Sequence, residues 1–127
     1  MLKVTAKRLE KMGACSGQVR LFRKLYPRGL EIPKEEGERF RVLTMAAMRH
    51  LNVGWYVNRV RLNASYTNSS GTYRRFARGQ MHSSGPAMVE SNGTVSYYRH
   101  GSRMHRVLRG YMNTDTGALV EPNPRVR

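Results

Sequence analysis

The chain has 127 residues, enough for one ordinary domain, and its hydrophobic fraction of 39% predicts a modest core. No apolar run reaches the roughly 18 to 20 residues that a membrane-spanning helix needs, so no membrane association is expected. The single cysteine, Cys15, excludes an intrachain disulfide and fits a reducing compartment. The N-terminus also lacks an apolar leader, so we expect a cytoplasmic protein.

The charge of the chain is strongly positive and unevenly distributed. Lys and Arg number 23 against 8 Asp and Glu, for a formal net charge of +15. Residues 1–38 carry nine basic and five acidic side chains, whereas residues 39–127 carry fourteen arginines and three acidic side chains. Arginine can grip phosphate or carboxylate with paired hydrogen bonds and can stack on bases. This charge predicts a polyanionic partner, most often nucleic acid, although a merely solvated surface would give the same count.

Residues 1–62 predict the helical half of an α+β protein. Apolar residues recur near helical spacing over residues 2–12, and Gly13 suits the end of that helix. A second amphipathic helix is predicted over residues 17–26, with Ser16 as its cap.

The remainder of this half predicts two further helices. Residues 30–32 read as a short extended link, and Pro33 suits the first turn of a third helix. Acidic side chains favour the positive end of that helix, and they are supplied by Glu35, Glu36 and Glu38. After a break at residues 52–54, a short helix is favoured over a strand for residues 55–62, with Trp55 as a core anchor.

A second half, over residues 69–112, contains an imperfect repeat. Gly71 and Gly79 recur 22 positions later as Gly93 and Gly101, and a Met-His pair recurs with one extra residue. Such a repeat predicts one supersecondary unit stacked on a copy of itself. The Asn, Ser, Thr and Gly content of residues 63–72 predicts a joint between the two halves.

The repeat half has the composition of short strands joined by tight turns. Strands are predicted over residues 72–78 and 94–99, and Asn92-Gly93 predicts a hairpin turn with positive φ at both central positions. Residues 87–90 should therefore pair with residues 94–98. We expect equivalent turns to end the strands at Gly79 and Gly101, one more strand to lie within residues 107–112, and a loose tail to span residues 122–127. The fold class is thus α+β in a single domain, with the helical half packed on a small antiparallel hairpin-repeat sheet.

Two stretches resemble known sequences. Gly85-Pro86-Ala87 and Asn92-Gly93-Thr94 lie in a segment, about residues 69–106, that resembles the MORN-like β-hairpin repeat of the form NGKLHREDGPA. Gly13-Ala14-Cys15, with the later Val53-Gly54-Trp55, resembles a helical motif of small phage-encoded proteins. These resemblances imply a phage or prophage setting, hence the host cytoplasm, and a hairpin shape. Neither brings catalytic residues.

The arginines of the repeat half are the candidate binding residues. Aromatic residues are interspersed with them, and such rings can stack on bases, but we favour their burial as the core of a thin sheet. We expect one Arg-rich face of the sheet to contact the backbone of DNA or RNA with little sequence selectivity, through Arg74, Arg75, Arg78, Arg99, Arg103, Arg106 and Arg109. The alternative is a protein-interaction module, such as an inhibitor of a host factor or a virion component, that binds an acidic protein surface.

No motif for a cofactor, a metal or an enzyme stands out, so no cofactor or metal is expected. His82 and His105 occupy equivalent repeat positions, which predicts a structural task such as hydrogen-bonding a turn. A metal-free ribonuclease would need an acid–base set, for which Glu90, one of these histidines and Arg99 are the candidates. Cys15 is predicted to be a small buried residue.

Overall fold

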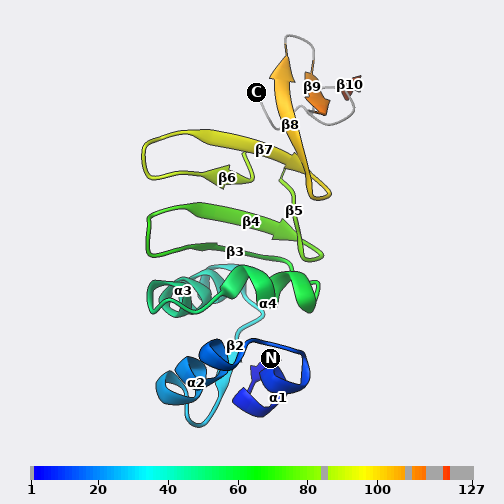
Figure 1. The fold of residues 1–127 in the computed structure, drawn as a ribbon. Helices are drawn as coiled ribbons and strands as arrows, with labels where there is room; N and C mark the ends of the chain where they lie inside the picture. Colours follow the sequence, from blue (N-terminus) through cyan, green and yellow to red (C-terminus); the bar gives the residue numbers. More distant parts are fainter. Residues whose placement is uncertain (1, 84–85, 108–109, 114–118, 121–127) are drawn as a thin grey trace.

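The computed structural model describes residues 2–83, 86–107, 110–113 and 119–120, with side chains described as far as Arg103. It has an α+β fold, as predicted, in which helices are followed by an antiparallel sheet (Figure 1). The helical half contains β1 (Leu2–Val4), α1 (Ala6–Lys11), α2 (Ser16–Leu25), β2 (Leu30–Ile32), α3 (Glu36–Met48) and α4 (Val53–Arg59). The sheet half contains β3 (Ala64–Thr67), β4 (Tyr73–Ala77), β5 (Gln80–Met81), β6 (Met88–Val89), β7 (Val95–Arg99), β8 (Ser102–Val107), β9 (Gly110–Asn113) and β10 (Leu119–Val120). Within these described ranges, no helix is both long and apolar enough to cross a bilayer.

The chain starts with a strand, so the helix predicted over residues 2–12 is wrong in its first turn. β1 pairs antiparallel with β2, which places Leu2 opposite Ile32 and Val4 opposite Leu30. This pairing buries Val4 and Ile32, and it confirms the extended conformation predicted for residues 30–32. Thr5 then ends the strand and caps α1, because its hydroxyl accepts a hydrogen bond from the Arg8 N–H at 3.2 Å.

Two helices begin elsewhere than predicted. α2 starts at Ser16, with Cys15 in the cap position and without a side-chain capping bond. α3 starts at Glu36, because the Glu35 carboxylate accepts hydrogen bonds from the N–H groups of Gly37 at 2.9 Å and Glu38 at 2.6 Å. These bonds hold the pKa of Glu35 below its ordinary value. The glutamates thus serve the helix start, as predicted, whereas Pro33 precedes the helix and is not in its first turn.

The helix predicted near Trp55 is confirmed as α4, but Trp55 is not its anchor. The buried residues Val53, Tyr56 and Val57 recur at helical spacing and turn one face inward. Trp55 is only half-buried, and the Arg59 guanidinium lies 5.8 Å from the centre of its ring. The cation and the tryptophan therefore cover the edge of the core together.

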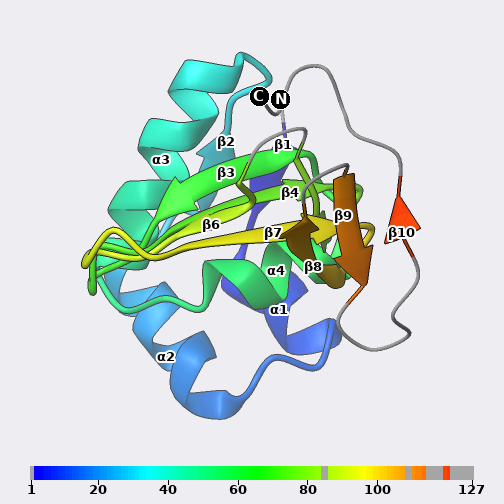
Figure 2. The same cartoon turned by 90° about the horizontal axis from the view of Figure 1, so that it is seen from above.

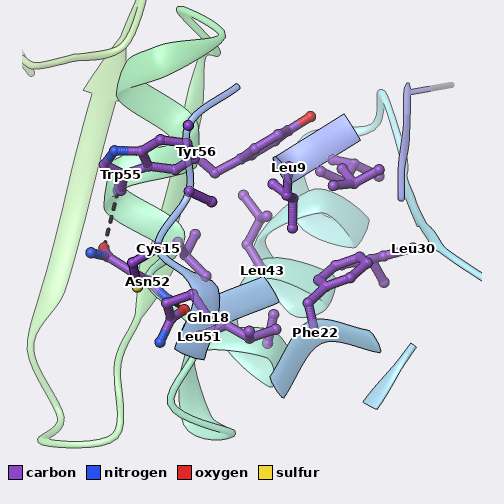
Figure 3. A pocket seen from close by; sticks show the side chains of 16 residues that line it. Leu9, Cys15, Gln18, Phe22, Leu30, Leu43, Leu51, Asn52, Trp55 and Tyr56 are labelled. Carbon is purple, nitrogen blue, oxygen red and sulfur yellow. Dashed lines mark hydrogen bonds between the residues drawn. The ribbon is translucent and has the colours of Figure 1, made fainter. Parts of the chain in front are cut away.

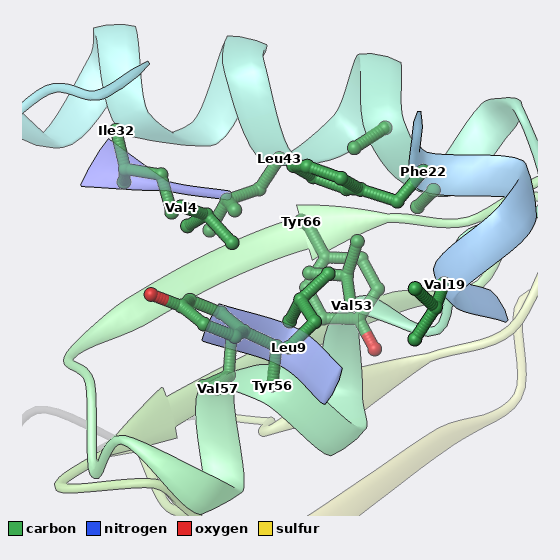
Figure 4. Packing of buried hydrophobic residues seen from close by; sticks show 12 residues of the cluster. Val4, Leu9, Val19, Phe22, Ile32, Leu43, Val53, Tyr56, Val57 and Tyr66 are labelled. Atoms are coloured by element: carbon green, nitrogen blue, oxygen red, sulfur yellow. The ribbon is translucent and has the colours of Figure 1, made fainter. Parts of the chain in front are cut away.

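The core lies between the helices and the first strand of the large sheet (Figure 4). Leu43 of α3 and Val57 of α4 are almost wholly excluded from solvent, at 2% and 0% exposure. Phe22 of α2 and Tyr66 of β3 belong to the same cluster. The core therefore joins the helical half to the sheet through β3.

The sheet is one antiparallel array in the order β10-β9-β8-β7-β6-β4-β3, with β5 paired to β4. Figure 2 looks down this array and shows β3, β4, β6 and β7 lying over one another. The joint predicted over residues 63–72 is wrong in part, because residues 64–67 form β3. Packing of Tyr66 in the core outweighs the turn-forming tendency of its polar neighbours.

Helix α3 lies along the outer edge of β3. The Thr67 N–H, which points away from β4, donates to the Thr44 hydroxyl of α3 at 3.1 Å. The Arg39 guanidinium also donates to the Asn63 carbonyl at 2.8 Å. These side chains satisfy backbone groups that would otherwise form an open sheet edge.

The repeat is visible as two kinds of turn that recur after 22 residues. In the first kind, Asn68 N–H donates to Thr72 carbonyl at 3.0 Å, and Glu90 N–H donates to Thr94 carbonyl at 2.8 Å. In the second kind, both residues of the turn have positive φ. The angle is 51° at Arg78 and at His100, and it is 81° at Gly79 and 85° at Gly101. The predicted equivalence of the turns at Gly79 and Gly101 is confirmed.

The hairpin predicted at Asn92-Gly93 is confirmed, but its turn type is different. β6 pairs with β7 as expected, through Met88 with Ser96. Within the turn only Gly93 has positive φ, at 89°, and its N–H donates to the Glu90 carbonyl at 2.9 Å. This is the longer turn with a glycine bulge, whereas the tight turn with two positive φ angles occurs at Arg78-Gly79.

Candidate nucleic-acid interface

The arginines predicted to share one sheet face are divided between two faces. Paired residues of neighbouring strands point to the same side, and successive residues alternate. Tyr73 pairs with Val89, which pairs with Val95, so these three side chains point to one side. Arg75 follows Tyr73 by two positions and Arg99 follows Val95 by four, so both arginines point to that side as well. This side, which we name the Arg75 face, carries Tyr73, Arg75, Val89, Val95, Tyr97 and Arg99.

The opposite side, the Arg74 face, carries Tyr66, Arg74, Phe76, Met88, Ser96, Tyr98 and Arg103. Arg74 and Arg75 are adjacent in sequence and therefore point in opposite directions. Arg78 belongs to neither face, because it lies in the exposed turn between β4 and β5. Arg106 lies on β8 with its side chain outside the described residues, and Arg109 lies outside them altogether.

Helices α3 and α4 contact different faces of the sheet. On the Arg75 face, Phe40 of α3 packs on Tyr73, with ring centres 6.3 Å apart. On the Arg74 face, Phe76 stacks on Tyr66 with centres 6.0 Å apart and planes within 5°. A Cβ atom on Gly54 of α4 would lie 2.8 Å from the Tyr66 hydroxyl, which shows how closely α4 approaches this face. These β4 rings therefore serve packing, as predicted.

A polar groove of about 280 Å³ lies where α3 meets the Arg75 face. Three cationic side chains, Lys34, Arg39 and Arg75, line it together with one acidic side chain, Glu36. The Arg39 Nε donates to the Pro33 carbonyl at 2.7 Å, and its Nη1 donates to the Asn63 carbonyl. Two hydrogen bonds thus fix the Arg39 guanidinium before any ligand arrives.

Arg75 pairs with Glu36, the one acidic side chain among the described residues that line this groove. Its Nη1 lies 3.3 Å from a Glu36 carboxylate oxygen, and both side chains are largely exposed. An exposed pair of this kind contributes little to stability and exchanges readily with an anionic ligand. The groove therefore keeps a net positive charge and a guanidinium that already binds a carboxylate.

Sequence reasoning missed Lys34 and Arg39 as members of this site. Both belong to the helical half, far in sequence from Arg75. Lys34 precedes the helix cap, and Arg39 is one of many arginines on a helix, so neither carries a local signal. Only the packing of α3 on the edge of β3 brings them beside the sheet.

His82 performs the structural task predicted for it. Its Nδ1 accepts a hydrogen bond from the His100 N–H in the turn between β7 and β8, at 3.1 Å. The two imidazole rings stack with their centres 4.4 Å apart. Burial, followed by the positive charges of His100 and Arg99, lowers the pKa of His82, which favours the neutral acceptor. The side chain of His105 lies outside the described residues.

The structure separates the residues considered for acid–base catalysis. Glu90 precedes the turn that leads into β7, whereas His82 contacts the turn at the other end of β7. Five strand residues lie between these ends, a span of about 16 Å at roughly 3.3 Å per residue. Glu90, His82 and Arg99 therefore do not form one acid–base site.

The prediction that Cys15 is buried is wrong. Cys15 is exposed, because it occupies the cap position where the chain enters α2 from the surface. Among the described residues, no group of three His, Cys, Asp or Glu side chains is arranged to hold a metal ion.

Comparison with known proteins does not assign the chain to a family. The site described above therefore has to be interpreted from its own geometry and charge. No family model, curated protein sequence or solved structure matches the chain.

Proposed function

We propose that this protein binds the sugar–phosphate backbone of nucleic acid, with little sequence selectivity, through the groove at the Arg75 face. The observation that carries the proposal is the convergence of Lys34, Arg39 and Arg75 around one acidic side chain. Phosphate oxygens are suitable ligands for such a cluster, because guanidinium groups donate paired hydrogen bonds to them. Release of counterions from the nucleic acid would add to the affinity.

The charge distribution around the groove supports the same proposal. Between residues 63 and 103, the described sheet half has five arginines and a single acidic residue, Glu90. Most described acidic residues lie in the helical half, where Glu10, Glu36 and Glu38 form ion pairs with arginines and Glu35 caps α3. Arg99 adds a partly buried positive charge to the Arg75 face, and the exposed Arg78 adds one at the turn.

The division of the arginines favours one strand of nucleic acid over a broad duplex contact. Arg74 and Arg103 point away from the groove, so a single bound strand does not reach all seven predicted residues. Tyr97 lies on the same face as Arg75, on β7, which is separated from β4 by β6. A single strand following the face would meet cationic and aromatic side chains in turn.

Binding to an acidic protein surface is the second candidate. The Arg75–Glu36 pair favours it, because Arg75 binds a carboxylate in this setting. A phage setting and a cytoplasmic location remain part of the proposal under either partner. They are supported by the resemblance of the hairpin repeat and by the lone thiol.

Fluorescence anisotropy with a labelled single-stranded oligonucleotide, measured across salt concentrations, tests the proposal. Replacing Lys34 and Arg75 together by Gln should weaken binding and flatten the salt slope by about 1.4, at roughly 0.7 per lost phosphate contact. A matched control replaces Arg20 and Lys24, which are exposed on α2, and so removes the same charge elsewhere. An equal loss of affinity in the groove variant and in the control variant would contradict a role for the groove.

The same assay distinguishes the two partners. Unlabelled poly-L-glutamate is added as a competitor at the same charge concentration as an unlabelled oligonucleotide. The nucleic-acid proposal expects the oligonucleotide to compete much better, because phosphate oxygens and bases both contribute. Equal competition by poly-L-glutamate would favour the acidic protein surface.

A further inference from the structure

The helical half contains an apolar cavity of about 310 Å³, partly open to solvent, that plays no part in the groove (Figure 3). It lies between the α1–α2 pair and the inner faces of α3 and α4. Its walls are mostly buried aliphatic and aromatic side chains, among them Leu9, Phe22, Leu43, Val53, Trp55 and Tyr56. Because the cavity is partly open to solvent, a small molecule can reach these apolar walls.

The size of the cavity indicates the size of such a molecule. An apolar cavity of about 150 Å³ stays dry and binds benzene, and ligand pockets generally begin at about 300 Å³. The present cavity therefore fits a medium-length alkyl chain or a small ring system. Its apolar walls exclude the polyanion proposed for the groove.

One polar group in the wall lacks a partner within the described part of the chain. The Tyr56 hydroxyl is buried and makes no hydrogen bond there, and Tyr56 as a whole is 7% exposed. Buried hydroxyl groups are nearly always paired, so this one is available to a ligand. Burial also raises the pKa of Tyr56, against a smaller opposing effect of Arg8, so the hydroxyl keeps its proton and can donate.

The polar groups nearest the surface are, by contrast, already used. Gln18 accepts a hydrogen bond from the Asn52 N–H at 2.8 Å and donates to the His50 carbonyl at 3.2 Å. The Asn52 side chain accepts from the Trp55 N–H at 3.1 Å. These bonds tie α2 to the start of α4 and build a fixed rim, on which the exposed Cys15 also lies.

We propose that this cavity is a binding site for a small, largely apolar molecule that carries one hydroxyl or carbonyl group. The apolar part occupies the space among Leu9, Phe22 and Leu43, and the polar group pairs with the Tyr56 hydroxyl. The site is independent of the groove and of the partner that the groove binds.

Two side chains of the cavity provide direct reporters. Trp55 is the only tryptophan and Cys15 the only cysteine of the chain, and both line the cavity. Octan-1-ol is a suitable probe, since it is non-fluorescent and combines an alkyl chain with one hydroxyl. Titration with octan-1-ol should change Trp55 emission saturably and should slow the labelling of Cys15 by a thiol reagent.

Variants test where and how the probe binds. Tyr56→Phe should weaken octan-1-ol binding by about 2- to 10-fold, the worth of one ordinary hydrogen bond. Ala46→Leu, which fills the cavity from α3, should abolish binding, with folding checked by circular dichroism; Ala14→Leu fills it from the loop before α2 if the first variant does not fold. Absence of a saturable signal in the wild-type protein, or unchanged affinity in Tyr56→Phe or in a folded cavity-filling variant, would overturn the proposal.

Discussion

Gly79 is one of the residues through which the repeat half contacts the helices, and Gly79→Ala should destabilise the protein severely. Its N–H donates to the Leu62 carbonyl at 3.1 Å, and its carbonyl accepts from the Asn58 side chain at 3.0 Å. A Cβ atom at this position would lie 2.8 Å from the Asn58 carbonyl oxygen and 2.9 Å from the Arg61 Cα. These atoms belong to the backbone at the end of α4, so they cannot move without shifting the helix.

Gly101 provides the matched control, because it occupies the same turn in the second copy of the repeat. Its φ of 85° is close to the 81° of Gly79, so alanine costs about 1 to 2 kcal/mol at either position. A Cβ atom on Gly101 would meet only the Gln80 side chain, at an ordinary 3.7 Å. At Gly79 the backbone contacts add about 1 to 3 kcal/mol of overpacking, for a total of about 2 to 5 kcal/mol.

Urea unfolding followed by circular dichroism measures both losses in the free energy of unfolding. We expect the loss for Gly79→Ala to exceed that for Gly101→Ala by at least about 1 kcal/mol, the lower limit of the overpacking cost. Equal losses for the two variants would refute the reasoning. They would show that the turn geometry alone decides the cost and that α4 yields to the extra methyl group.

Three further predictions test the core, the groove and the repeat turn. Leu43→Ala should lower the free energy of unfolding by about 2 to 5 kcal/mol in the same urea assay, because Leu43 is 2% exposed. Glu36→Gln removes the negative charge of the groove and releases Arg75. The affinity for a single-stranded oligonucleotide should therefore rise a few-fold at low salt. A fall in affinity would contradict the assignment of the groove as an anion-binding site. The pKa of His82 lies below its ordinary value of 6.5, so its contribution to stability is complete above pH 6.5 and is lost as the pH falls through the lower folded pKa. Urea midpoints at pH 7.5 and 5 should therefore differ more in the wild-type protein than in His82→Ala.

The features that the sequence predicted correctly are those that depend on near neighbours. Glycines at fixed offsets located the turns at Gly79, Gly93 and Gly101, because positive φ excludes most other residues. The second, third and fourth helices were recognised from apolar spacing and from acidic residues at a helix start. These signals depend only on residues that are close together in the sequence, so a single sequence contains them completely.

The features that were missed depend on distant partners. Residues 2–4 form a strand only because residues 30–32 pair with them, and residues 64–67 form one because Tyr66 packs in the core. The opposite directions of Arg74 and Arg75 follow from alternation along one strand, but the side on which Arg99 and Arg103 lie depends on pairing across several turns. The true turn between β6 and β7 has an additional residue relative to the tight turn that was expected, which changes the parity.

The location of the candidate groove explains why the charge pattern alone was a poor guide to the site. The arginines predicted to bind all lie in the sheet half, at residues 74–109, yet Lys34 and Arg39 come from the helical half. Arg75 becomes part of a site only because α3 lies along β3, held there by Thr44 and Arg39. Because each half supplies only some of the cations, a site-specific contact requires both halves to be docked, whereas a nonspecific charge effect does not. Partial unfolding of the helical half should therefore abolish groove-dependent binding while the net charge of the chain stays the same.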